Sequence, residues 1–204
     1  MNLNIPYMET DNKLLNDAYR IAAGDIVGNI VYYQNGLLTE EKPCMIAGLD
    51  YNTPWTRDTA INIWNALSIL SPEVSKNTLL AVLEEEEGNI YIGGQYWDSI
   101  IWMIGAREYC RFHKDDNFYR LAFEAGRNSV HRLEEDEFDE EDGLFRGPAV
   151  YGDGIAAYPD KYSKCPNQGS GILEWVDYPG NPVYPKGYGI PMKALSTNCV
   201  YFKV

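Results

Sequence analysis

The stretch from Leu49 to Trp64, LDYNTPWTRDTAINIW, holds residues well suited to bind a polar ligand. Its first half is a polar, aromatic loop with four candidate contacts: Asp50, Tyr51, Asn52 and Trp55. A helix is expected to follow, with Thr56 as the N-cap residue and with Arg57 and Asp58 in the first turn. The indole of Trp55, the guanidinium of Arg57 and the carboxylate of Asp58 would then lie together at the start of the helix, an arrangement that suits a neutral ligand rich in hydroxyl groups. The alternative is a capped helix in which Asp58 favours the dipole and Trp55 packs.

The composition is that of a globular, acidic protein. The chain has 204 residues, 45% of them apolar and 13% aromatic, which is enough for one domain with a sizeable core. Its net charge of −13 argues against nucleic acid and anionic membrane as partners, because both require a basic patch. Much of the charge falls in two runs, Glu84–Glu87 and Glu134–Asp142, which we interpret as solvated helix ends.

The sequence predicts neither a metal nor a cofactor. The four cysteines form no CxxC pair, and the two histidines, His113 and His131, complete no metal-ligand pattern. Cys110 lies in an apolar helical pattern and is expected to be a buried free thiol. Walker, Rossmann and G-x-S-x-G motifs are missing from the sequence. A cytoplasmic protein is expected, because no signal peptide or membrane span is visible, unless an export signal has been lost.

Apolar residues at helical spacing predict an all-α protein. Helices are expected over residues 11–33, 57–70, 72–86, 100–109, 118–133 and 192–204, and a short β-like run at 90–92. Long polar loops alternate with short turns along the chain. Antiparallel helical hairpins would bring the long loops to one face, which is how an α/α toroid builds a cleft.

Three ordered motifs add a resemblance to a known family. They are PWTRD at 54–58, QYWDSIIWMIGAREYCRFHKDD at 95–116 and, more loosely, DEEDGLFRGPAVYGDGIAAYP at 139–159. In this order they resemble motifs of the six-hairpin glycosidases, the (α/α)6-barrel clan of glucoamylases, trehalases, processing-type glucosidases and some disaccharide phosphorylases. The sequence has His113-Lys114-Asp115 where the clan usually has a TGD turn.

The resemblance implies a glycoside hydrolase that cleaves a glucose-type bond, with inversion. Arg57 and Asp58 would hold hydroxyls of the sugar in the cleaved subsite, and Trp55 would be its apolar wall. The next quadrant of the cleft would be lined by Tyr96, Trp97 and Asp98. Asp153 would be the general acid, since burial beside aromatics such as Tyr151 would keep its carboxyl protonated. The alternatives are a helix N-cap at Asp98 and a Gly-Asp-Gly turn at Asp153.

About six helices are expected, where a full toroid needs roughly twice as many. Residues 1–204 would therefore be the N-terminal part of a single (α/α)-barrel catalytic domain. The general base of an inverting enzyme, about 6.5–9.5 Å from the acid, would lie beyond the chain or late in it, at Glu174 or Asp177. Three other readings stay open: a non-catalytic sugar-binding fragment, a disaccharide phosphorylase of the same fold, and a polysaccharide lyase. The expected partner is an oligosaccharide or glycoside. If the chain is complete, the exposed edge of the half-barrel would favour a homo-oligomer.

Overall fold

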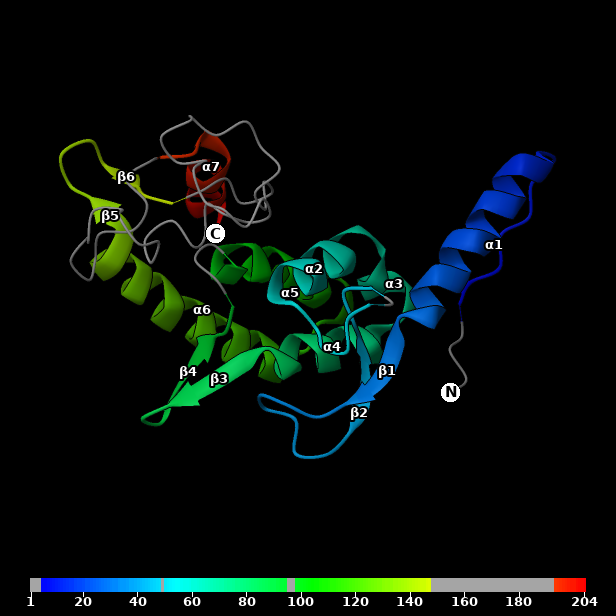
Figure 1. The fold of residues 1–204 in the computed structure, drawn as a ribbon, viewed down its shortest axis with the longest axis horizontal. Helices are drawn as coiled ribbons and strands as arrows, with labels where there is room; N and C mark the ends of the chain where they lie inside the picture. Colours follow the sequence, from blue (N-terminus) through cyan, green and yellow to red (C-terminus); the bar gives the residue numbers. More distant parts are fainter. Residues whose placement is uncertain (1–4, 49, 95–97, 148–192) are drawn as a thin grey trace.

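The computed structural model describes residues 5–48, 50–94, 98–147 and 193–204. These residues are mostly helical, and three antiparallel two-stranded hairpins accompany the helices (Figure 1). The prediction of a helical protein is confirmed at this level, although the sequence showed only one of the short strands. No helix in the described ranges is long and apolar enough to cross a membrane.

Helix α5 (Asp98–His113) forms the centre of the helical body. It packs against α2 (Thr56–Asn62), α4 (Pro72–Ala81) and α6 (Asp116–Glu137). Helix α5 is strongly apolar, which suits a helix covered by neighbours on several sides, and Trp102 in its second turn is fully buried. The Trp102 indole N–H donates to the carbonyl of Leu79 over 3.3 Å, and its ring lies 6.4 Å from that of Phe118. These contacts join α4, α5 and α6 into one core.

The helix predicted over 57–70 is present as a continuous helical run. It consists of α2, a π-helical turn (Ile63–Leu67) and α3 (Ser68–Leu70), and Pro72 then opens α4. The expected cap is wrong, however. Trp55 holds the N-cap position, with φ −110° and ψ 136°, and Thr56 is the first helical residue. The Thr56 hydroxyl donates instead to the Gly93 carbonyl.

Two predicted helices are too long because each runs into a strand. Helix α1 (Lys13–Gly28) is followed by the C-cap residue Asn29, and β1 (Ile30–Tyr33) then pairs with β2 (Lys42–Met45). The β-branched and aromatic side chains of Ile30–Tyr33 explain the change from helix to strand. Likewise α4 ends at Ala81, and β3 (Leu83–Glu86) pairs with β4 (Asn89–Ile92), which confirms the predicted β-like run.

The hairpin of β3 and β4 also corrects the interpretation of the first acidic run. Glu84, Glu85 and Glu86 lie in a strand and not at a helix end. The two residues of the turn, Glu87 and Gly88, both have positive φ, of 52° and 79°, as tight hairpin turns require.

The C-terminal helices also differ from the prediction. Helix α6 (Asp116–Glu137) continues beyond the predicted end at residue 133. A hairpin of β5 (Phe138–Asp139) and β6 (Leu144–Phe145) follows it. Helix α7 (Leu195–Lys203) begins later than predicted and contacts β6, where the Phe145 and Tyr201 rings stack 3.6 Å apart.

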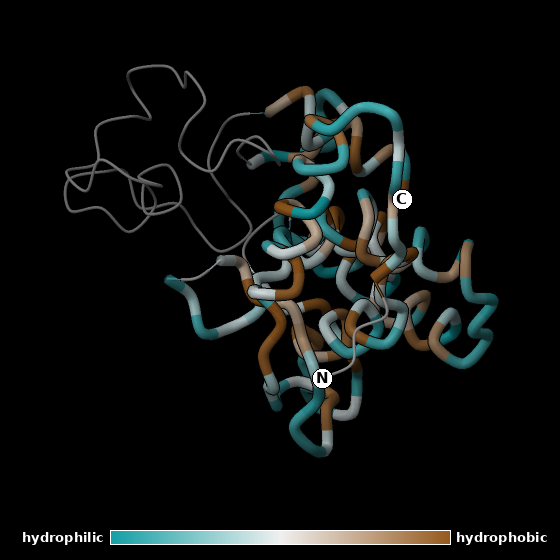
Figure 2. The backbone as a smooth tube through the Cα atoms, turned by 90° about the vertical axis from the view of Figure 1, so that its right-hand side faces the viewer, coloured by the Kyte–Doolittle hydropathy of each residue, from teal (hydrophilic) through white to brown (hydrophobic). Residues whose placement is uncertain are grey.

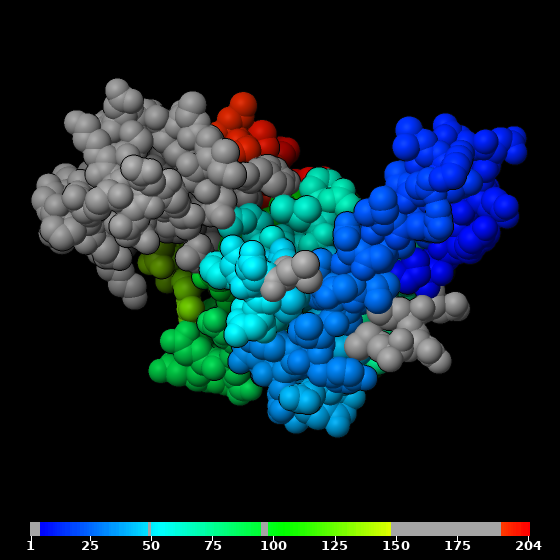
Figure 3. All heavy atoms as spheres, turned by 45° about the vertical axis from the view of Figure 1, so that its right-hand side comes forward, coloured from blue at the N-terminus to red at the C-terminus, as the bar shows by residue number. Residues whose placement is uncertain are grey.

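Helix α1 projects from the body of the molecule, as Figures 1 and 3 show. None of its residues is buried, and apolar side chains such as Leu14 and Ile21 are 78% and 66% exposed. Apolar and polar residues alternate along the helical parts of the backbone (Figure 2), as amphipathic helices require. Most apolar side chains of α1 therefore face solvent, while Ile26 near its end packs against the core.

Candidate functional site

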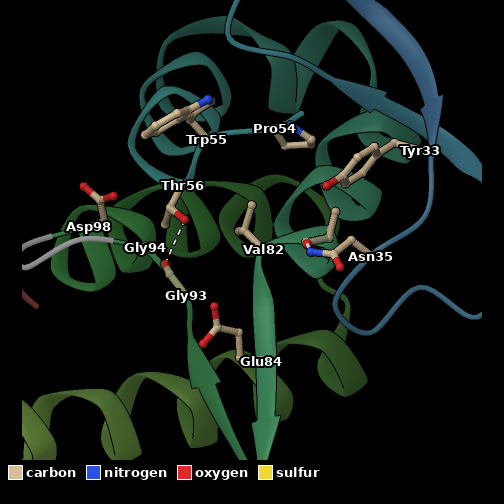
Figure 4. A pocket seen from close by; sticks show the side chains of 11 residues that line it. Tyr33, Asn35, Pro54, Trp55, Thr56, Val82, Glu84, Gly93, Gly94 and Asp98 are labelled. Atoms are coloured by element: carbon tan, nitrogen blue, oxygen red, sulfur yellow. Dashed lines mark hydrogen bonds between the residues drawn. The ribbon is translucent and has the colours of Figure 1, made fainter. Parts of the chain in front are cut away.

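A cleft of about 180 Å³ lies where the starts of α2 and α5 meet the bases of two hairpins (Figure 4). Its walls come from the end of β1, the loop before α2, the end of α4, strand β3 and the segment that links β4 to α5. The lining residues are Tyr33, Asn35, Pro54, Trp55, Thr56, Ala81, Val82, Glu84, Gly93, Gly94 and Asp98.

Trp55 forms the aromatic wall of this cleft. Its side chain is 38% exposed, and the edge of the Tyr51 ring meets it at 5.9 Å and 73°. The Trp55 carbonyl accepts the first helical hydrogen bond, from the Thr59 N–H over 2.8 Å. The extended backbone of Trp55 and this hydrogen bond at the start of α2 therefore fix the position of the Trp55 indole, which remains accessible to a ligand.

A glycine pair joins the two helix starts. The Thr56 hydroxyl donates to the Gly93 carbonyl over 2.8 Å, which ties α2 to the segment after β4. Gly94 has φ +120°, and a Cβ there would lie 2.7 Å from Asp98 Oδ2 and 2.9 Å from Thr56 Oγ1. Asp98, the first residue of α5, is only 2% exposed. Position 94 requires glycine, because the Thr56 hydroxyl and the Asp98 carboxylate lie too close to its backbone for a side chain to fit.

Glu84 is a lining residue that the sequence analysis missed. Its exposed side chain reaches from β3 to Gly93, while Asp98 lies against Gly94, so that two carboxylates flank consecutive glycines (Figure 4). A run of glutamates looks like a solvated surface. The available signal was the Glu87-Gly88 turn, because a hairpin centred there places Glu84 opposite Tyr91.

The structure brings together two of the predicted site residues, Trp55 and Asp98. Asp50 and Asn52 lie exposed on the loop before α2, outside the cleft lining. Arg57 is 8% exposed and Asp58 is half-buried in the first turn of α2, and neither lines the cleft. Their binding roles stay predictions. Other candidates lie outside the described residues: Tyr96, Trp97, Tyr151, Asp153, Glu174 and Asp177.

The cysteines in the described ranges are free thiols. Cys110 is half-buried and not fully buried as expected, and burial raises its pKa to about 11. Burial raises the pKa of the fully enclosed Cys44 to about 12. Within the described residues, no group of His, Cys, Asp or Glu side chains is arranged to hold a metal ion.

The cleft combines groups that complement a polyhydroxylated ring. An aromatic face can cover the C–H side of such a ring, and a carboxylate can accept hydrogen bonds from its hydroxyls. Comparisons of the chain with protein-family models, with curated proteins and with solved structures found no match.

Proposed function

We propose that the protein is a glycoside hydrolase that binds a glucose-type sugar ring in the cleft between Trp55 and Asp98. The observation that carries this proposal is that a partly exposed indole, Trp55, and a buried carboxylate, Asp98, line one cleft. The lining combines apolar groups such as Trp55 and Val82 with polar groups such as Thr56 and Asp98, and ligand sites commonly combine the two kinds of group. The order of the three motifs, which resembles that of the six-hairpin glycosidases, supports the same reading.

In this proposal Asp98, at the start of α5, accepts hydrogen bonds from sugar hydroxyls. Asp153 remains the proposed general acid. Its proton would pass to the glycosidic oxygen as the bond to the anomeric carbon breaks. Water would add to that carbon from the opposite face and lose a proton to a second carboxylate, about 6.5–9.5 Å from the acid.

The proposed architecture is an (α/α)6 toroid, of which these helices would form the first part. The packing of α2 against α5 and of α5 against α6 supports an arrangement in helical hairpins. In that architecture the cleft at the starts of α2 and α5 would be the place where the substrate binds.

Release of reducing sugar from α- and β-linked glucose disaccharides and aryl glucosides tests this function. We expect hydrolysis by the native protein and a 10- to 100-fold lower kcat/KM in Asp98→Asn, because a hydrogen bond to a charged group contributes about 1.5–3 kcal/mol. Asp116→Asn is the matched control, since Asp116 lies exposed in the first turn of α6 and does not line the cleft.

Other outcomes separate the alternatives. Full activity of Asp98→Asn would contradict the assigned role of this carboxylate. Cleavage that requires inorganic phosphate and yields a sugar phosphate would identify a phosphorylase. Sugar binding without any cleavage would favour a non-catalytic binding fragment, and neither binding nor cleavage would contradict the proposal as a whole.

A further inference from the structure

In the hairpin of β1 and β2, a helix covers the outer edge of the second strand. The Met45 N–H donates to Thr78 Oγ1 over 3.0 Å. Two residues earlier in β2, the Pro43 carbonyl accepts from Asn77 Nδ2 over 3.2 Å. Asn77 and Thr78 are neighbours on α4, so this helix occupies the backbone groups that β2 directs away from β1.

The hairpin of β3 and β4 repeats this arrangement. On β4, the Ile92 N–H donates to Ser129 Oγ over 2.9 Å. The Ile90 carbonyl accepts from Asn128 Nδ2, on the same helix α6, over 3.1 Å. An Asn followed by Ser or Thr therefore closes the outer edge of β2 and of β4 to a further strand.

Strand β1 has no such cover among the described residues. The Ile46 N–H donates to the Asn29 carbonyl over 2.9 Å, which marks these two residues as a hydrogen-bonded pair. Because such pairs alternate along an antiparallel ladder, Ile30 and Tyr32 direct their N–H and C=O groups away from β2. These groups form no hydrogen bond to another described residue. The outer edge of β1, on the right of its hairpin in Figure 1, is therefore free.

The sequence of β1 lacks the features that usually protect a free edge. Charged residues, proline and bulges keep exposed strands from pairing with other chains. Strand β3 carries such charges at Glu84–Glu86, whereas β1 reads IVYY, and these residue types favour strands. An uncharged edge is also where two copies of a chain with a net charge of −13 can approach with the least repulsion.

The free edge of β1 is self-complementary. We propose that β1 pairs with β1 of a second copy of the chain, in the antiparallel direction, about a two-fold axis at Val31. Ile30 then lies opposite Tyr32 of the partner subunit, and each such pair exchanges both of its N–H···O bonds. An aliphatic residue opposite an aromatic one also stabilises a ladder. The two hairpins then form one continuous antiparallel sheet.

Helix α1 extends the same interface. A pairing of short strands is a small contact compared with the roughly 1,200–2,000 Å² that stable interfaces bury. Helix α1 leads into β1 through Asn29 alone, and the two form one continuous surface in Figure 3. Its exposed apolar side chains, Leu14 and Ile21 among them, add area beside the paired strands.

Amide hydrogen exchange followed by NMR tests this pairing without a substitution. The protein is compared at concentrations above and below the midpoint of dimer dissociation. We expect the Ile30 and Tyr32 N–H groups to exchange at least about tenfold more slowly in the dimer, where they are hydrogen-bonded. The Val31 and Tyr33 N–H groups are the internal control, because they face β2 and should change little.

The variant Tyr32→Pro tests the same contact by removing one donor. Proline lacks the N–H that points away from β2, and edge strands tolerate it, so the pairing of β1 with β2 should persist. We expect the dissociation constant of the dimer, measured by analytical ultracentrifugation, to rise at least about tenfold. Tyr32→Phe is the matched control, because it keeps the N–H and the ring and should dimerise as the native protein does. Melting temperatures show whether both variants fold.

Several results would overturn the inference. One is a native protein that is monomeric at every concentration, including one whose β1 edge binds a foreign peptide instead. Another is a dimer in which the Ile30 and Tyr32 N–H groups exchange as fast as in the monomer. An unchanged dissociation constant in folded Tyr32→Pro would also contradict the pairing. If Tyr32→Pro does not fold, the exchange measurement decides alone.

Discussion

Asp115 shows how one carboxylate can stabilise several elements at once. Its Oδ1 accepts the Phe118 N–H over 3.0 Å and caps α6, and its Oδ2 lies 2.6 Å from Lys76 Nζ on α4. The Lys76 ammonium, first, and the Phe118 N–H hold the pKa of Asp115 below its usual value of 3.8. Asp115 therefore has a structural role in this chain.

Substitution of Asp115 should reduce stability. We expect Asp115→Ala to lower the free energy of unfolding by about 1–2 kcal/mol through loss of the cap. Asp115→Asn should cost less, because Asn also caps helices and the ion pair near the surface contributes little. Chemical denaturation measures these changes, and exposed Asp116→Ala is the control. An unchanged denaturation midpoint for Asp115→Ala would contradict the capping role.

The same residue predicts a pH dependence. Because its pKa is lower in the folded protein, its contribution is fully present above pH 3.8 and is lost as the pH falls through the folded value. The native protein should therefore lose stability on acidification below pH 3.8 more steeply than Asp115→Asn does. Thermal melting between neutral and acidic pH checks this, and parallel curves for the two proteins would refute it.

The thiols should differ in reactivity according to burial. The thiolate is the reactive form, and burial raises the pKa of the Cys44 thiol to about 12, whereas Cys199 is exposed. Iodoacetamide should label Cys199 in the native protein and Cys44 only in denaturant, as read by peptide mass spectrometry. Labelling of Cys44 at the rate of Cys199 under native conditions would contradict the buried position.

The sequence predicted Trp55 from the polar, aromatic loop before a helix, and it predicted Asp98 from the resemblance of the second motif to the six-hairpin glycosidases. Sequence reasoning missed Glu84 because nothing in a run of glutamates distinguishes the one residue that lines a cleft from those that face solvent. Only the pairing of β3 with β4 brings Glu84 to Gly93. The third motif, with Asp153, lies outside the described residues.

At the scale of elements, the segment after β4 couples the starts of α2 and α5. Gly94→Ala would place a Cβ 2.7 Å from Asp98 Oδ2 at a φ of +120° that L-residues rarely adopt. We expect a loss of stability of about 1–3 kcal/mol. Gly24→Ala, in exposed α1 with nothing within 4 Å, should instead be neutral or stabilise by up to about 1 kcal/mol. Equal melting temperatures for the two variants would contradict the close approach at Gly94.

Helix positions followed from apolar spacing, but several helix ends did not. The apolar spacing of α1 extends to Ile30, and that of α4 extends to Leu83. A prediction from spacing alone therefore extended both helices into the strands that follow them. Strand formation there depends on partners distant along the chain, such as Cys44 opposite Val31. For Glu84–Glu86 this pairing overrides a poor intrinsic preference for strands.

At the scale of the whole molecule, α1 offers an uncovered apolar side. Its charges are of both signs and partly pair within the helix, since Lys13 and Arg20 both form ion pairs with Asp17. Exposed apolar patches of this kind favour association. We expect a concentration-dependent dimer by size exclusion with light scattering, and a monomer in the Leu14→Lys, Ile21→Lys double variant. A monomeric native protein at all concentrations would contradict this prediction.

The closure of a toroid could not be deduced from helix periodicity, because closure depends on contacts between distant hairpins. The described residues supply a packed helical body with α5 at its centre, and the architecture beyond that stays a proposal. The charge of −13 limited the classes of partner but carried no information on fold.

The central claim is that a sugar ring binds against Trp55 beside Asp98. Its most direct test is calorimetric titration of glucose and the glucose disaccharides into the native protein, Trp55→Ala and Trp64→Ala. Trp64 is the matched control, because it is 37% exposed, close to the 38% of Trp55, and lies under Lys203 outside the cleft. We predict that Trp55→Ala weakens binding about 10- to 100-fold, as loss of a buried aromatic contact implies, and that Trp64→Ala binds as the native protein does. Equal affinities for the native protein and Trp55→Ala would contradict the claim.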